Sequence, residues 1–326
     1  MSQTVTYRQA ITMAMADAME EDDRVLLFGE DVAVAGGAFK LSDGLLERFG
    51  PRRVRDTPIS EQAIIGTAIG AAVQGLRPIA EIMFADFAGV CFDGIANELA
   101  KYRYMTGGQV SVPATIRLGN GGGGGFAAQH SQPVENWFLN VLGLKIVVPG
   151  TPADAYGLLR AAIRDPDPVL YFEHKHLFGT KGELGDAPAI VEIGKAEVVR
   201  AGSDVTLVAT QLMRHRAVEA AERLAAEGVS VEVIDPRTLV PLDVETVGAS
   251  IDRTNRLVIA QESSQDGSWG ATLVARLMAA RFESFDAPPL LVGGDDTPIP
   301  YAGPLEALWL PSVDRIVDGV RRTLAF

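Results

Sequence analysis

Apolar residues occur along the chain in short runs that alternate with stretches of helical periodicity. Short apolar runs bounded by Gly or Pro predict buried strands, and their alternation with helices predicts βα units around a mostly parallel sheet. The predicted strands lie at 24–31, 77–84, 113–118, 144–149, 168–173, 204–210, 229–235 and 256–262. The predicted helices lie at 7–20, 89–104, 152–164, 212–227, 268–282 and 312–324. The pattern predicts an α/β fold.

The helical periodicity is lost at 178–203, where Gly, Pro and charged residues gather. We therefore expect a linker at 178–203, between a first domain at 1–177 and a smaller α/β domain at 204–326. A chain of 326 residues is long enough for two domains of ordinary size.

Composition narrows the function classes. With 47% hydrophobic and 22% charged residues, the chain can bury a substantial core. A formal net charge of -13 argues against a nucleic acid or an anionic membrane as partner. No run approaches the ~18–20 apolar residues of a membrane span, and we expect a cytoplasmic protein. The single cysteine, Cys91, lies in an apolar run, so we expect a buried thiol and no intramolecular disulfide.

The glycine run "RLGNGGGGGF" contains a G-x-G-x-x-G pattern at Gly119, Gly121 and Gly124. A dinucleotide site needs a helix to begin there and an acidic residue about 20 positions later. Here Pro133 follows within ten residues and the acidic residue is missing. Nicotinamide binding stays an alternative, but glycines also let a backbone adopt unusual angles beside a ligand or a second chain.

His130 follows the glycine run on a predicted loop, in the sequence "AAQHSQP". A loop histidine is commonly a surface residue, yet histidine titrates near neutrality and serves as an acid or base in catalysis. Ser131 beside it suggests a hydrolase, but the chain has no G-x-S-x-G elbow.

The stretch "DTPISEQAIIGTAIGAAVQG" predicts a helix that begins at Glu61 with Ser60 as its N-cap. An acidic residue in a first turn is favoured by the helix dipole by ~0.3–1 kcal/mol, which alone would explain Glu61. The helix body, however, exposes small residues such as Gly66 and Gly70. Such a face lets another backbone approach closely. We therefore expect this helix to pack against another, plausibly from a partner subunit, with Glu61 at the seam.

Several motifs now occur in order: "LFGEDVA", "DTPISEQAIIGTAIGAAVQGLRPIAEIMFADF", "KYRYMTGG", "AAQHSQ", "GLKIVVPGTPADAYGLL", "DPDPV" and "VIDPRTLVPLD". Together they resemble the beta subunit of the thiamine-diphosphate-dependent decarboxylating component of 2-oxo acid dehydrogenase complexes. The resemblance runs from about residue 4 to the C-terminus. It implies a transketolase-type pyrimidine-binding domain, a parallel sheet with helices on both faces, followed by a transketolase C-terminal-type α/β domain.

The resemblance also implies an α2β2 heterotetramer with thiamine diphosphate held between α and β. Glu61 would hydrogen-bond N1′ of the cofactor's aminopyrimidine, Phe87 would stack on that ring, and Met83 and Ile59 would line its pocket. His130 would contact the substrate or the acylated intermediate and assist transfer to the lipoyl arm. Glu30 would be a further acid near the seam.

The resemblance implies two metal sites, one for Mg2+ in the α subunit and one for K+ in some relatives of this chain. The family's usual G-D-G and N-N motifs for the diphosphate and Mg2+ are missing here, so we expect the α subunit to hold Mg2+ and this chain to be inactive alone. Some relatives hold a structural K+, although Asp167 here replaces the commoner asparagine. The corresponding positions are Ala114, Ala162, Ile163, Asp165 and Asp167.

The resemblance implies an oxidoreductase that decarboxylates a 2-oxo acid and transfers the acyl group to lipoyl-lysine of an acyltransferase core. Pyruvate is the favoured substrate, and the acetoin-cleaving and branched-chain types remain alternatives. Two other classes remain open: a non-catalytic assembly subunit and a nicotinamide oxidoreductase.

Overall fold

The computed structural model describes residues 3–326, which divide into two compact units. The first unit contains the chain up to Asn120 together with Trp137–Ile193. The second contains Gly121–Asn136 together with Gly194–Phe326. The glycine run and His130 therefore belong to the second unit, although they lie within the predicted first domain.

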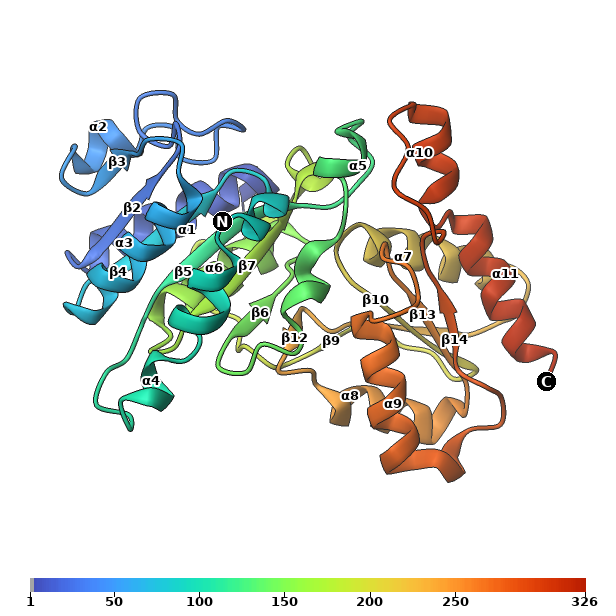
Figure 1. Ribbon diagram of the computed structural model, residues 1–326. Helices are drawn as coiled ribbons and strands as arrows, with labels where there is room; N and C mark the ends of the chain where they lie inside the picture. Colours follow the sequence, from blue (N-terminus) through green and yellow to red (C-terminus); the bar gives the residue numbers. More distant parts are fainter. Residues whose placement is uncertain (1–2) are drawn as a thin grey trace. The chain divides into compact units, whose positions relative to one another are not determined.

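The first unit is built on a parallel sheet with the strand order β6-β7-β5-β4-β2-β3, whose strands lie side by side in Figure 1. Its strands are β2 (Val25–Gly29), β3 (Val54–Asp56), β4 (Arg77–Ile82), β5 (Thr115–Asn120), β6 (Lys145–Val147) and β7 (Val169–His174). Its α-helices are α1 (Tyr7–Glu21), α2 (Leu45–Phe49), α3 (Glu61–Val73), α4 (Tyr102–Met105) and α6 (Pro152–Arg164). Short 3-10 turns are η1 (Ala85–Gly89) and η4 (Lys175–Leu177). The predicted α/β class is confirmed.

Local signals explain where the helices of this unit begin. Thr6 caps α1, and its backbone N–H in turn donates to the Gln9 side chain at 2.8 Å, which makes a capping box. Thr151 caps α6, and Pro152 occupies the first turn, where its missing N–H costs nothing. Helices α1 and α6 then pack against each other.

The predicted helix at 89–104 is only partly confirmed, because the segment is not one regular α-helix. The segment instead contains a turn of π-helix, η2 (Gly94–Leu99), followed by the short helix α4. Glycine has low helix propensity, and Gly94 lies so close to α3 that an added Cβ would be 3.0 Å from Ile65 Cγ2. The segment therefore follows the surface of α3.

The second unit has a sheet of order β14-β13-β10-β11-β9, parallel except for β9. Its strands are β9 (Glu197–Arg200), β10 (Val205–Ala209), β11 (Val231–Asp235), β13 (Leu257–Ala260) and β14 (Leu290–Val292), and β12 (Thr238–Val240) follows β11 in the chain. Its helices are α5 (Ala127–His130), α7 (Gln211–Ala225), α8 (Val244–Thr254), α9 (Trp269–Arg281), α10 (Gly303–Trp309) and α11 (Val313–Leu324). The 3-10 turn η5 (Phe282–Ser284) follows α9, and η3 (Val134–Phe138) begins near the end of the segment Gly121–Asn136.

The segment 178–203 is not an irregular linker throughout. Strand β8 (Lys181–Leu184) pairs antiparallel with β1 (Gln3–Thr6), and β9 pairs antiparallel with β11. Strands β1, β8 and β9 have four residues each, β1 is mostly polar and β8 and β9 carry charged residues, so they lack the apolar run that marks a buried strand. The change from one unit to the next falls at Ile193–Gly194.

Within residues 3–326, none of the helices combines the length and the apolar character that crossing a bilayer requires.

Candidate functional site

Glu30 and Glu61 lie at the carboxyl ends of the strands of the first unit. Glu30 directly follows β2, and Glu61 begins α3, the helix after β3. Met83 and Phe87 follow β4, which pairs with β2. In open parallel sheets, ligands bind outside the carboxyl ends of the strands. The topology therefore brings these sequence-predicted residues to one edge of one sheet.

Both glutamates are withdrawn from solvent. Glu61 is 7% exposed and Glu30 is 9% exposed. Glu30 Oε1 has no hydrogen-bond partner among the described residues. Burial raises the pKa of Glu30, and the nearby carboxylates, Glu61 first among them, raise it further. Two buried carboxylates of this kind favour a ligand that brings a proton or a hydrogen-bond donor.

The thiol of Cys91 reports the same negative charge. The predicted burial of this cysteine is confirmed. Burial, and then the carboxylate of Glu61, raises the pKa of the thiol to about 12. Cys91 is therefore a protonated packing residue near Glu61 rather than a nucleophile.

Ser60 occupies the N-cap position of α3, but its side chain makes no capping hydrogen bond. The sequence predicted that the Ser60 hydroxyl would accept an N-terminal N–H group of this helix, and the structure shows no such hydrogen bond. Glu61 still benefits from its place in the first turn, where the helix dipole favours negative charge.

The predicted pocket residues differ in exposure. Met83 and Phe87 are half-buried, and the ring of Phe87 packs edge-on against Phe84 with centroids 6.1 Å apart. Ile59, just before α3, is 84% exposed. An isoleucine exposed to this degree beside a buried acid can contact a ligand or a second chain.

A buried ion cluster lies in the middle of the same sheet, and sequence reasoning missed it. Arg117 on β5 is fully buried and pairs with Glu81 on β4 at 2.7 Å and with Glu173 on β7 at 2.6 Å. Burial raises the pKa of Glu173 to about 7, against the opposing effect of Arg117. The available signal was a single charged residue inside each of three apolar strands.

His130 is the last residue of α5 in the second unit and is half-buried. The next residue, Ser131, is fully buried, and its Oγ has no hydrogen-bond partner among the described residues. Glu61 belongs to the first unit and His130 to the second.

The glycine run does not form a dinucleotide loop. Its backbone has positive φ at Gly121, Gly123 and Gly125, and the helix that follows, α5, spans four residues. Its N–H groups donate to the protein's own carboxylates, those of Glu262 and Glu306. These amides are therefore not available for a pyrophosphate.

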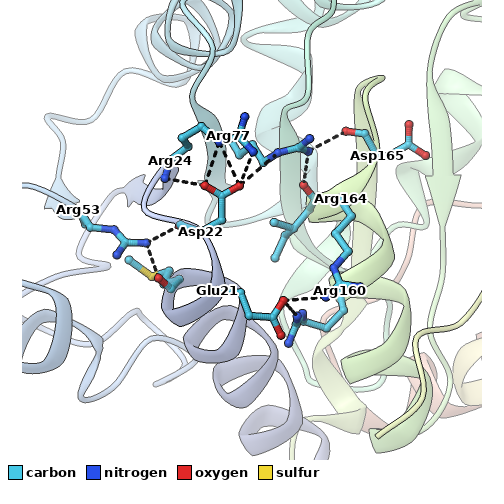
Figure 2. A network of polar contacts seen from close by, with 10 residues as sticks. Glu21, Asp22, Arg24, Arg53, Arg77, Arg160, Arg164 and Asp165 are labelled. Atoms are coloured by element: carbon cyan, nitrogen blue, oxygen red, sulfur yellow. Dashed lines mark hydrogen bonds and ion pairs between the residues drawn. The ribbon is translucent and has the colours of Figure 1, made fainter.

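The residues considered for K+ have hydrogen-bond and ion-pair partners within the protein. Arg77 donates to the carbonyl oxygens of Ile163 at 2.9 Å and Asp165 at 3.4 Å (Figure 2). Lys145 Nζ lies 2.6 Å from the Asp165 carboxylate, and Arg103 pairs with Asp167. The carbonyl oxygens of Ala114 and Ala162 accept backbone N–H groups. Arginine and lysine side chains of the protein itself therefore already contact oxygens of Ile163, Asp165 and Asp167.

Elsewhere among the described residues, no group of three or more His, Cys, Asp or Glu side chains is arranged to hold a metal ion.

Comparison with known proteins agrees with this architecture. Residues 3–181 match the transketolase pyrimidine-binding domain, and residues 194–316 match the transketolase C-terminal domain. A solved structure described as "Split gene transketolase, inactive beta4 tetramer" superposes with a TM-score of 0.80, at 26% identity over 98% of both chains.

Among curated proteins, the chain is 45% identical to the pyruvate dehydrogenase E1 component subunit beta of Rhizobium meliloti, over 98% of this chain and 69% of the relative. It is also 45% identical to the 3-methyl-2-oxobutanoate dehydrogenase subunit beta of Mycobacterium tuberculosis, over 99% and 93%. It is 44% identical to the acetoin:2,6-dichlorophenolindophenol oxidoreductase subunit beta of Bacillus subtilis, over 98% and 96%. The chain belongs to the transketolase-type family that comprises the beta subunits of the pyruvate, acetoin and branched-chain 2-oxo acid dehydrogenases.

Proposed function

We propose that this chain is the beta half of a cytoplasmic, thiamine-diphosphate-dependent 2-oxo acid dehydrogenase with pyruvate as its substrate. It would work as an α2β2 heterotetramer and pass the acyl group to lipoyl-lysine of an acyltransferase core. The observation that carries the proposal is the buried carboxylate of Glu61 at the start of α3, beside a second buried acid, Glu30.

The described residues fit the aminopyrimidine end of the cofactor. Glu61 would share a proton with N1′ of the ring, because a buried carboxylate is stabilised by a hydrogen-bond donor. The half-buried Phe87 would stack on the ring, while Met83 and the exposed Ile59 would line its edge. When bound, thiamine diphosphate supplies the electron sink for decarboxylation.

Each protein group then has a stated task. Glu61 would hold the proton at N1′, and the raised pKa of Glu30, caused by burial and then by the carboxylate of Glu61, favours the protonated form of that neighbour. His130 would contact the substrate or the acylated intermediate and assist transfer to the lipoyl group. The α subunit would bind the diphosphate and Mg2+.

The exposed face of α3 supports an α partner. Gly66 and Gly70 are exposed, and a Cβ added at either would contact nothing within 4 Å in this chain. A helix with glycines on its outer face gives up roughly 1 kcal/mol per glycine relative to alanine. That cost is offset when another helix packs closely against the face.

Substrate choice is divided among the relatives, which are named for pyruvate, 3-methyl-2-oxobutanoate and acetoin at nearly equal identity. Assay of the co-expressed α–β pair against these three compounds would test the proposal of pyruvate. If turnover is fastest with 3-methyl-2-oxobutanoate or acetoin, that compound replaces pyruvate as the proposed substrate, and the rest of the proposal is unaffected.

Glu61→Gln tests the catalytic function. In the co-expressed pair we expect turnover to fall by about 10²-fold or more, the usual contribution of a positioned acid or base, while assembly measured by size exclusion is unchanged. Glu47→Gln, an exposed glutamate in α2, is the matched control and should leave turnover unaltered. Retained turnover in Glu61→Gln would instead favour a non-catalytic assembly subunit.

A further inference from the structure

The glycine run 121–125 is held by two carboxylates from distant parts of the second unit. Gly123 N–H donates to Glu306 Oε1 at 2.8 Å, and Gly125 N–H donates to Glu306 Oε2 at 3.0 Å. Gly122 N–H donates to Glu262 Oε2 at 3.1 Å. The loop therefore wraps its backbone N–H groups around acidic side chains.

Glu306, on α10, has an unusual environment for a glutamate. It is 3% exposed. Both of its oxygens accept backbone N–H groups of the loop. A buried carboxylate is strongly penalised unless it is hydrogen-bonded, so the amides of the glycine run are what make this position tolerable.

The glycines are needed for this geometry. Positive φ at Gly121, Gly123 and Gly125 turns successive N–H groups toward one side, as in the backbone concavities that bind anions. At Gly122, an added Cβ would be 3.3 Å from Leu310 and 3.4 Å from the carbonyl oxygen of Ser131. The run is therefore an anion-binding loop whose anion is supplied by the protein itself.

The same loop leads directly to His130. After Gly125 the chain enters α5, whose first residue, Ala127, has φ of +61° and whose last residue is His130. The following Ser131 is fully buried. The segment is thus anchored by carboxylates on one side of His130 and by burial on the other.

We propose that Glu306 is a positioning residue for the reaction: its carboxylate holds the glycine run so that α5 presents His130 in one orientation. The effect on the reaction rests on the role given to His130 in the proposed function. The clamp, by which we mean the two hydrogen bonds from Gly123 and Gly125 to Glu306, does not depend on that role.

The two oxygens of Glu306 explain why a carboxylate is required. Both accept an N–H group, so both must be acceptors. Glutamine keeps one acceptor and places an NH2 donor against the second N–H group. Glu306→Gln should therefore release one end of the clamp with almost no change in side-chain volume.

The first measurement is amide hydrogen exchange of a peptide that covers 121–130, in the co-expressed α–β complex. We expect exchange in Glu306→Gln to be at least tenfold faster than in the unaltered complex, because protection requires the hydrogen bond. Glu283→Gln, an exposed glutamate in the same unit, is the matched control and should exchange as the unaltered protein does. Unchanged exchange in Glu306→Gln would overturn the clamp.

The second measurement is the ratio of lipoyl-linked to dye-linked turnover, with 2,6-dichlorophenolindophenol as the artificial acceptor. We expect Glu306→Gln to shift this ratio at least tenfold, in the same direction as His130→Ala. A variant that merely folds less well loses active sites and lowers both rates together, so the ratio would not move. Faster exchange with an unchanged ratio would overturn the positioning role.

His130→Ala separates failure of the inference from failure of the proposed function. If this variant leaves both rates unaltered, the role assigned to His130 is wrong, and the positioning role falls with it. Exchange of the glycine run would still report whether Glu306 holds the loop.

Discussion

Replacing Arg117 by methionine should destabilise the first unit severely. The guanidinium is fully buried and pairs with two buried carboxylates, Glu81 at 2.7 Å and Glu173 at 2.6 Å. Its removal leaves two carboxylates in the core without a counter-charge. Breaking a buried ion pair in this way typically costs about 3–5 kcal/mol. At roughly 2–4 °C per kcal/mol for a unit of this size, Tm should fall by about 6–20 °C.

The cost should depend on pH in a defined direction. The pKa of Glu173 is already raised from 4.5 to about 7 by burial, although Arg117 opposes the shift. Without Arg117, which lowers the pKa of Glu173, this carboxyl group holds its proton more tightly in the folded state. An acid with a raised pKa adds stability below its unfolded pKa, and this is lost as pH rises through the folded value. The difference from the unaltered chain should therefore be larger at pH 8 than at pH 5.5.

Urea unfolding of the full chain at pH 5.5 and pH 8 measures both effects. Arg48→Met is the matched control, since the Arg48–Glu20 pair is about half exposed and should contribute less than about 1 kcal/mol. The triple variant Arg117→Met, Glu81→Gln, Glu173→Gln should recover part of the loss. A loss below about 1 kcal/mol, or a loss equal at the two pH values, would refute the reasoning.

Three further outcomes are expected. Gly143→Ala should lower the free energy of unfolding by about 3 kcal/mol or more, because φ is +105° and the new Cβ would collide with the carbonyl oxygen of Ala100. A Tm within about 2 °C of the parent would contradict this. Asp22→Asn should lower the free energy of unfolding only at pH values where Asp22 is ionised, because the hydrogen bond from Arg24 lowers the pKa of Asp22 from 3.8 to about 2. The difference in unfolding free energy between variant and parent, measured in urea, should be constant above about pH 5 and shrink as pH falls from about 4 to about 2. Gly66→Leu should leave the Tm of the isolated chain intact but weaken α–β assembly in size exclusion, and unimpaired assembly would exclude the outer face of α3 from that interface.

Local patterns predicted the elements whose ends carry their own chemistry. Helix α6 occupies 152–164 as predicted, because Thr151 and Pro152 define its start within the sequence. Long-range pairing was not predictable in this way. Strand β8 pairs with β1, which lies almost at the other end of the first unit in sequence. Neither strand has an apolar pattern from which this pairing could be predicted.

In the candidate site too, residues with a local sequence signal were predicted and residues defined by long-range contacts were not. Glu61 was identified because a glutamate at the start of a small-sided helix is anomalous within a single short stretch. Glu306 could not be identified, because its partner Gly123 lies 183 residues away and a glutamate in a first helical turn has an ordinary explanation. Arg117 was missed because a lone charge inside an apolar strand says nothing about which neighbouring strand neutralises it.

The amino-acid sequence by itself determined the α/β class, most of the buried strands and helices, the family, and the acid at the start of α3. Periodicity, capping and ordered motifs are all properties of neighbouring residues. Only the tertiary structure decided that the glycine run belongs to the second unit, that its amides bind Glu262 and Glu306, and that Arg77 and Lys145 occupy oxygens considered for K+. The physical reason is that a buried charge must be neutralised or hydrogen-bonded by whatever group packing brings to it, and packing joins residues that are far apart in the chain.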